Sequence, residues 1–319
     1  MDTKYLVDLE LLPALEYLPP FDLSLALLPQ MRGMMVEMFN QRRAAAPPSD
    51  IVVEERHIPG PAGAPDVRVL IYSPPGVTTM KPGYLHIHGG GYIMGTPEMT
   101  ELQDKAMVGE IGCVIVSVDY RLAPETPHPG PVEDCYAALK WFHANAASLG
   151  VDPGRLAIGG ESAGAGLSAA LGLLARDRGE VPLAFQLLIY PMLDDRTVTR
   201  SEPHEFTGEF TWNAQMNRFG WHSLLGQEPG AHGVSHYAAA ARAESLAGLP
   251  PTFISVGALD VFLDEDIDYA KRLLAAGVPT ELHVYPGAYH GFDVVAADAD
   301  VSKRSRRDAV GALQRALYR

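Results

Sequence analysis

A serine stands at the centre of the most specific pattern in the chain. Gly160-Glu161-Ser162-Ala163-Gly164 is a G-x-S-x-G sequence that follows the strand-like run LAIGG and opens a helix-like run. A sharp strand-to-helix turn exposes a serine hydroxyl, and its crowded backbone needs small residues two positions to either side. The positive end of the helix dipole favours the charge that develops during attack on a carbonyl. The pattern therefore predicts that Ser162 is a nucleophile.

A run of glycines follows another strand-like segment. His88-Gly89-Gly90-Gly91 comes at the end of the apolar run YLHIH. Because glycine lacks a Cβ, the amides of Gly89 and Gly90 can approach an oxyanion closely, and the amide of Ala163 can join them. We expect His88 to brace this loop by hydrogen bonding. A phosphate-binding loop is the competing interpretation, but the run has neither a Lys-Ser/Thr pair nor G-x-G-x-x-G spacing.

A nucleophilic serine needs a proton acceptor, and position decides among the 11 histidines. His290 follows the last apolar run, ELHVYP, at the carboxyl end of the expected sheet, where open α/β folds gather functional groups. Asp260 follows the preceding run, TFISVG, at the same edge. We predict His290 as the general base and Asp260 as its orienting carboxylate. The rival carboxylates open the next helix, where acids are common for capping and dipole reasons; they are Asp264, Glu265, Asp266 and Asp268.

The elements that must position these residues alternate along the chain. From about residue 51, short β-like runs alternate with helix-like segments, which predicts an α/β fold with a mostly parallel eight-stranded sheet flanked by helices. The strand-like runs are 51–58, 67–73, 84–88, 114–120, 156–160, 185–190, 252–257 and 281–286. The helix-like runs are about 99–110, 131–147, 163–177, 264–276 and 299–317.

Two segments, 1–48 and 196–246, do not follow this alternation. We expect them to form a helical cap over a core made of 49–195 and 247–319. Apolar residues recur at helical spacing in both segments: Met31, Met34, Met35, Met38 and Phe39 in the first, and Trp212, Met216 and Phe219 in the second. Packing between helices is the favoured explanation, but such side chains also suit a cap that closes over varied apolar ligands. Met38, Trp212 and Met216 are therefore candidate substrate-binding residues.

Composition narrows the classes of partner. The chain has 319 residues and a formal charge of −14, which opposes binding to nucleic acid or to anionic membrane surfaces. It has no basic, apolar leader and no apolar run near the roughly 20 residues of a membrane span, so a cytoplasmic location is the expectation. Cys113 and Cys135 have neither a disulfide pattern nor metal-ligand spacing.

Taken together, these stretches resemble the hormone-sensitive-lipase-like (family IV) bacterial carboxylesterases of the α/β-hydrolase superfamily, the acetyl-esterase and arylesterase group. The matching stretches are HGGGYIMG (88–95), VDYRLAPE (118–125), PGPVEDCYAAL (129–139), GGESAGAGL (159–167), LPPTFISVGALDVFLDED (249–266) and YPGAYHGF (285–292). Two of them, PGPVEDCYAAL and LPPTF, are similar to the bacterial heroin-esterase type. The chain departs from many members at Glu161, where they carry Asp, and at Ala165, where they carry Gly.

The resemblance implies a triad of Ser162, Asp260 and His290, an oxyanion hole of Gly89, Gly90 and Ala163, the cap, and neither cofactor nor metal. It implies hydrolysis of small esters with short to medium acyl chains, and many members form homodimers. Amide or lactone hydrolysis is the nearest alternative, since the same triad can be acylated from all three. A ligand-binding protein without activity, as in the plant gibberellin receptors of this fold, is a second alternative, and the presence of His290 argues against it.

Overall fold

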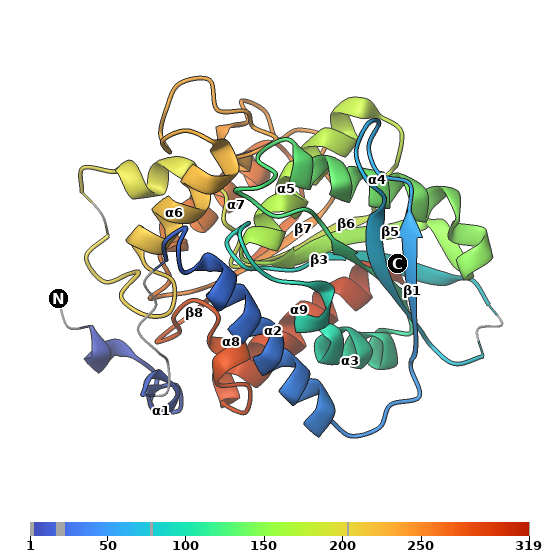
Figure 1. The fold of residues 1–319 in the computed structure, drawn as a ribbon, viewed down its shortest axis with the longest axis horizontal. Helices are drawn as coiled ribbons and strands as arrows, with labels where there is room; N and C mark the ends of the chain where they lie inside the picture. The colour runs from blue at the N-terminus through green and yellow to red at the C-terminus, as the bar shows by residue number, and fades with distance from the viewer. Residues whose placement is uncertain (1–2, 17–22, 77–78, 203, 319) are drawn as a thin grey trace.

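The computed structural model describes residues 3–16, 23–76, 79–202 and 204–318 (Figure 1). The strands are β1 Val52–Ile58, β2 Val67–Ser73, β3 Lys81–Ile87, β4 Val114–Asp119, β5 Val151–Glu161, β6 Phe185–Ile189, β7 Thr252–Gly257 and β8 Thr280–Tyr285. The helices are α1 Leu12–Leu15, α2 Leu28–Ala45, α3 Glu101–Ile111, α4 Gly130–Ala144, α5 Ala163–Arg178, α6 Ala214–Leu225, α7 Leu263–Ala275, α8 Phe292–Val295 and α9 Asp300–Leu317. Within these ranges no helix has both the length and the apolar character of a membrane span.

The strands form one eight-stranded sheet in the order β1-β2-β4-β3-β5-β6-β7-β8. β1 and β2 form an antiparallel hairpin, and β2 pairs antiparallel with β4. Every later pairing is parallel. The predicted α/β architecture, with its mostly parallel eight-stranded sheet, is confirmed.

Helices cover both faces of the sheet (Figure 1). Neighbouring residues of a strand point to opposite faces, so the central strand β3 contributes to two cores. Leu85 packs in the cluster that contains the buried sides of α4 and α5. Tyr84 packs in the cluster that contains the buried sides of α3 and α9. Because both faces are buried, β6 and β7 read as almost continuous apolar runs.

The two segments expected to form a cap contact each other and the loops that follow the strands. Thr3 donates its amide and its hydroxyl to the Glu209 carboxylate at 2.6 and 2.5 Å. Arg32 of α2 donates to the carbonyls of Ile93 and Ala123 at 2.7 and 2.9 Å. Side chains from both segments, Met31 and Trp212 among them, belong to the main hydrophobic cluster. These contacts place the two segments against the carboxyl ends of the strands.

The prediction of a single buried apolar face on α2 is only partly correct. Met31 and Phe39 are buried, and Met35 packs against the core. Met34 and Met38 are 50% and 42% exposed and lie away from that core. Met31, Met35 and Phe39 follow one another at intervals of four and face the core, whereas Met34 and Met38 lie at the edge of the same stripe and face outward, so the spacing overestimated the buried face.

An ion pair fixes the loop after β4 against α4. Arg121 donates from Nε and from a terminal nitrogen to Asp134 at 2.8 and 2.7 Å, and its amide donates to the same carboxylate at 3.0 Å. The Asp134 side chain is fully buried, whereas Arg121 keeps about a third of its side chain exposed. The bidentate pair thus joins two motifs of the sequence, VDYRLAPE and PGPVEDCYAAL.

We expect Asp134→Ala to lower the free energy of unfolding by about 2–4 kcal/mol, because it leaves a partly buried guanidinium and an amide without their acceptor. Urea unfolding followed by circular dichroism measures the change. Asp152→Ala is the matched control, because its pair with Arg155 lies at the surface, and it should leave the unfolding midpoint almost unchanged. Equal midpoints for wild type and Asp134→Ala would contradict this structural role.

Candidate active site

Ser162 occupies a strained turn between β5 and α5. Its φ and ψ are 57° and −121°, a left-handed conformation that is rare for a residue with a side chain. Its amide donates to the Ile189 carbonyl at 2.9 Å, and its carbonyl accepts from the Met192 amide at 3.1 Å. The end of β6 and the loop after it therefore hold the turn from one side.

The glycines of the G-x-S-x-G pattern are required by close backbone contact with β3. A Cβ on Gly160 would lie 2.0 Å from the Ile87 carbonyl oxygen, and a Cβ on Gly164 would lie 1.9 Å from the same atom. No side chain fits at either position without moving the backbone. The turn thus lies directly against the strand that leads to the glycine run.

The structure brings the three predicted triad residues together. His290 Nε2 lies 2.9 Å from Ser162 Oγ, and His290 Nδ1 lies 2.7 Å from Asp260 Oδ2. Asp260 also accepts the Phe262 amide through Oδ1 at 3.0 Å, which fixes its carboxylate plane. With Nδ1–H donating to the carboxylate, Nε2 carries a lone pair directed at the serine hydroxyl. Asp260 is fully buried, and Ser162 and His290 are each 8% exposed.

Aromatic rings surround the imidazole of His290. The rings of Tyr190 and Phe262 meet it edge-on, with centroids 4.8 and 5.1 Å away, and the Trp212 indole lies 6.4 Å away. The Thr211 hydroxyl donates to the His290 carbonyl at 2.6 Å. The three aromatic rings exclude water from the imidazole, and the rings and the Thr211 hydrogen bond together restrict its rotation.

The rival carboxylates have other partners or lie elsewhere. Glu265 accepts the amides of Leu193 and Asp194 at 2.7 and 3.2 Å. Asp264 pairs with Arg200 at the surface. Asp266 is buried on α7, where burial raises the pKa of its carboxyl well above the usual value. In the described part of the chain, no group of three or more His, Cys, Asp or Glu side chains is arranged to hold a metal ion.

The glycine run lies beside Ser162. A Cβ on Gly89 would lie 3.4 Å from Ser162 Cβ. Gly90 has a φ of 115°, and a Cβ added to it would lie 2.0 Å from the Met94 carbonyl oxygen. His88 contacts the Gly89 carbonyl through Nδ1 at 2.8 Å, and its ring stacks on Tyr120 at 4.3 Å. Burial lowers the pKa of His88 to about 4, so this ring is neutral at pH 7 and braces the loop.

The amides expected to bind an oxyanion are available. Among the described residues, those of Gly89, Gly90 and Ala163 donate to no backbone carbonyl outside the regular elements. Ala163 is the first residue of α5, where amides have no partner within the helix. The arrangement leaves donors from two neighbouring loops near Ser162.

The three candidate substrate-binding residues lie in different environments. Trp212 and Met216 are buried in the main cluster, and the position of a Cβ on Gly91 lies 2.3 Å from the Trp212 ring. The indole therefore lies directly on the glycine run. Met38 is 42% exposed on α2.

A buried polar network next to Ser162 was not predicted from the sequence. His86 of β3 lies between two carboxylates: its Nδ1 is 2.5 Å from Asp104 Oδ1, and its Nε2 is 2.9 Å from Glu161 Oε1. Gln103 donates to the same Glu161 oxygen at 2.7 Å. The sequence offered two separate signals: His86 stands inside an apolar strand, and Glu161 is an acidic residue within the serine pattern. They could not be interpreted without knowing that strands β3 and β5 pair.

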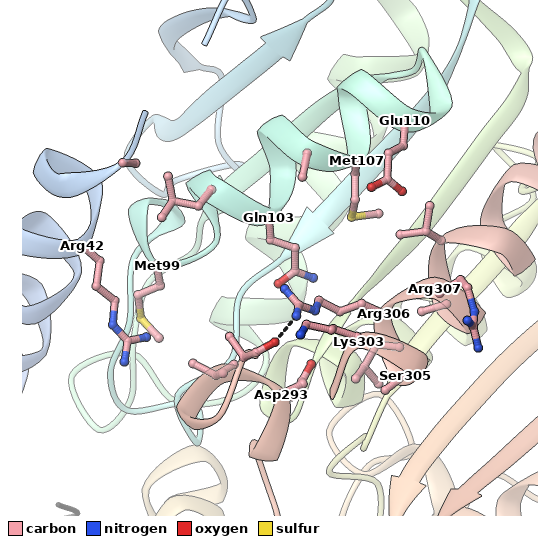
Figure 2. Close-up of a pocket in the computed structure, with 18 of the residues that line it drawn as sticks. Arg42, Met99, Gln103, Met107, Glu110, Asp293, Lys303, Ser305, Arg306 and Arg307 are labelled. Carbon is pink, nitrogen blue, oxygen red and sulfur yellow. Dashed lines mark hydrogen bonds between the residues drawn. The ribbon is translucent and has the colours of Figure 1, made fainter. Parts of the chain in front are cut away.

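A cleft of about 1210 Å³ opens between α2, α3, α8 and α9. Figure 2 shows Gln103 of α3 pointing into it from one wall and Lys303 and Arg306 of α9 from the other. Asp293, also in its wall, accepts a hydrogen bond from Tyr190 at 2.9 Å. Ser162, Asp260 and His290 do not line this cleft. The cleft therefore does not open onto the candidate triad.

The fold and this arrangement of side chains define the class of protein. The chain belongs to the α/β-hydrolase family, whose family model, described as the alpha/beta hydrolase fold, matches residues 84–294. The predicted family is thereby confirmed.

Several named relatives of this chain are esterases. It is 35% identical to the carboxylesterase NlhH of Mycobacterium tuberculosis over 290 residues, which are 90% of each chain. It is 42% identical to a solved bacterial heroin esterase, with a TM-score of 0.94 over 99% of this chain and 100% of that one. The esterase LipW from Mycobacterium marinum has a TM-score of 0.87 at 34% identity, over 100% of this chain and 98% of that one.

Proposed function

We propose that the chain is a serine carboxylesterase that cleaves small esters with short to medium acyl chains through an acyl-enzyme intermediate. The observation that carries the proposal is the continuous hydrogen-bonded array from Asp260 through His290 to Ser162 Oγ. Names of the relatives support ester hydrolysis as the activity. The formal charge of −14 favours neutral or cationic small substrates over polyanions.

The acylation half of the reaction uses the array directly. Ser162 Oγ attacks the ester carbonyl carbon while its proton passes to His290 Nε2. The amides of Gly89, Gly90 and Ala163 stabilise the oxyanion of the tetrahedral intermediate. The imidazolium then protonates the departing alkoxide, which leaves as the alcohol, and the acyl group stays on Oγ. Asp260 keeps Nδ1 protonated and stabilises the imidazolium without taking its proton.

Deacylation repeats these steps with water in place of serine. His290 Nε2 takes a proton from water, whose oxygen attacks the acyl carbon, and the proton returns to Oγ as the carboxylic acid leaves. The buried environment of His290 keeps other water away from the imidazolium. In this proposal the segments 1–48 and 196–246 form the cap that closes the acyl pocket, with Trp212 and Met216 at its wall and Met38 at its entrance.

A series of p-nitrophenyl esters from acetate to palmitate tests the proposed substrate class. We expect kcat/KM to be highest for acyl chains of short or medium length and to fall steeply for the longest, because contacts in a closed pocket discriminate by about 1–3 kcal/mol per methylene group. Matched anilides and lactones test the alternatives. Faster cleavage of anilides or lactones than of every ester would make the chain an amidase or lactonase, and no turnover of any of them would support a ligand-binding protein.

Trp212→Ala should shift the acyl-chain preference toward longer esters. The indole lies on Gly91 and 6.4 Å from the His290 ring, so its removal enlarges the space beside the reacting carbonyl. We expect the ratio of kcat/KM for octanoate to that for acetate to rise about 10- to 100-fold. Trp141→Ala on α4 is the control, because this tryptophan packs on Arg56 far from the triad. An unchanged ratio of kcat/KM for octanoate to that for acetate would show that Trp212 does not line the substrate pocket.

A further inference from the structure

The buried network behind the nucleophile joins the two strands that carry the reacting groups. His86 lies on β3, which leads into the glycine run, and Glu161 is the last residue of β5, directly before Ser162. The two strands pair in parallel, with His86 opposite Gly159 and Ile87 opposite Gly160. A side-chain link between His86 and Glu161 therefore connects the loop of oxyanion donors to the serine turn.

The geometry of the link is that of a ring fixed on both sides. Both ring nitrogens of His86 face carboxylates, and both Glu161 oxygens lie within 3.0 Å of Nε2. A neutral imidazole has one N–H, so donating to both carboxylates requires the imidazolium. Burial lowers the pKa of His86, but the charges of Asp104 and Glu161 and the hydrogen bonds to them outweigh burial, and the pKa rises well above its usual value.

Further hydrogen bonds anchor the outer members of the network to α3. Gln103 donates to Glu161 at 2.7 Å, and the Thr100 hydroxyl donates to Asp104 Oδ2 at 3.0 Å. His86 and Asp104 are completely buried, and Glu161 is 8% exposed. The carboxylate of Glu161 thus has a fixed position set by three elements of the fold, β3, α3 and β5.

The backbone of Glu161 transmits that position to both parts of the site. A Cβ on Gly89 would lie 2.9 Å from the Glu161 carbonyl oxygen, so Glu161 determines how closely the glycine run approaches the serine. On the other side, the left-handed φ of Ser162 is a conformation that persists only where the surroundings impose it. Ile189 and Met192 hold the turn from the β6 side, and Glu161 is its anchor on the β3 side.

We propose that His86, clamped between Asp104 and Glu161, is a positioning residue that sets Ser162 Oγ relative to His290 Nε2 and to the amide of Gly89. The inference rests on the proposed function. It assigns no contact with substrate to His86 or Glu161: both act through the placement of the serine turn. Loss of the clamp therefore lowers kcat, because a reacting atom displaced by about 1 Å costs up to about 100-fold in rate.

The test compares Glu161→Ala, Glu161→Gln and His86→Gln with wild type, using p-nitrophenyl acetate and titration of active sites with a p-nitrophenyl alkylphosphonate. We expect Glu161→Ala and His86→Gln to lower kcat per titrated site about 10- to 100-fold, with KM changed less than about threefold. Glu161→Gln keeps an oxygen that accepts from His86, so it should recover most of the lost kcat.

Glu101→Gln is the matched control. Glu101 is a buried carboxylate on α3, the helix that also carries Asp104. It pairs with Lys105 and Arg43 at 2.6 and 2.7 Å, and it does not contact His86. We expect its kcat per titrated site to equal that of wild type. If the network served only the stability of the fold, Glu161→Ala and His86→Gln would lower the number of titratable sites or the melting temperature, and kcat per titrated site would stay unchanged.

Two results would overturn the proposal. Either kcat per titrated site is unchanged in both Glu161→Ala and His86→Gln, or Glu161→Gln is as impaired as Glu161→Ala, which would make charge and not placement the relevant property. Failure of the proposed function looks different, because wild type would then show no burst of p-nitrophenol and no titratable site.

Discussion

Ser162→Ala should lower kcat for p-nitrophenyl acetate by about 10⁴- to 10⁶-fold while leaving the fold intact. The substitution removes one oxygen, the atom 2.9 Å from His290 Nε2, and leaves both backbone hydrogen bonds of the turn in place. Binding and oxyanion stabilisation survive without the nucleophile, so any remaining rate would come from direct attack by water. Initial rates at saturating ester, with circular dichroism on the same samples, measure the effect.

Ser168→Ala is the control for removing a buried hydroxyl. Ser168 lies on α5 and donates to the Gly164 carbonyl at 2.8 Å, without contact to His290 or Asp260. We expect its kcat to stay within about threefold of wild type. If Ser162→Ala kept more than about a tenth of the wild-type kcat, a different nucleophile would be responsible.

Asp260→Asn should lower kcat by about 10⁴-fold with little change in KM. The carboxylate accepts the Nδ1 proton at 2.7 Å, whereas an amide nitrogen at that position would donate and force the proton to Nε2. His290 would then present a donor to Ser162 and could not act as its base. The isosteric side chain can still accept the Phe262 amide, so the loop after β7 keeps its shape.

Asp264→Asn tests the assignment of the acid. Asp264 stands four residues later, lies in the first turn of α7 and pairs with Arg200 at the surface, and its substitution should leave kcat unchanged. A larger loss of kcat in Asp264→Asn or Glu265→Gln than in Asp260→Asn would show that the wrong carboxylate had been chosen.

The sequence carried enough information to predict the fold and the identities of the candidate triad. Each predicted residue follows an apolar run of strand length, and parallel strands end at the same edge, so Ser162, Asp260 and His290 had to converge there. The chain order of the three, together with the glycine run after β3, restricted the choice further.

Side-chain packing could not be predicted in the same way. The His86–Glu161 contact depends on strand register, because His86 faces Glu161 only when β3 and β5 pair as they do. On α2, helical spacing grouped Met34 and Met38 with Met31, but only the position of the helix against the core decides which of them is buried. Register and helix placement are properties of the assembled tertiary structure.

Mass spectrometry of the protein after reaction with a p-nitrophenyl alkylphosphonate, which mimics the tetrahedral intermediate, is the most direct test of Ser162 as the nucleophile. We expect one phosphonyl group per chain, located on the peptide that contains Ser162, with ester hydrolysis lost in proportion to labelling. We also expect that Ser162→Ala takes up no label. Labelling of another residue, or full hydrolytic activity in protein labelled completely on Ser162, would contradict this role of Ser162.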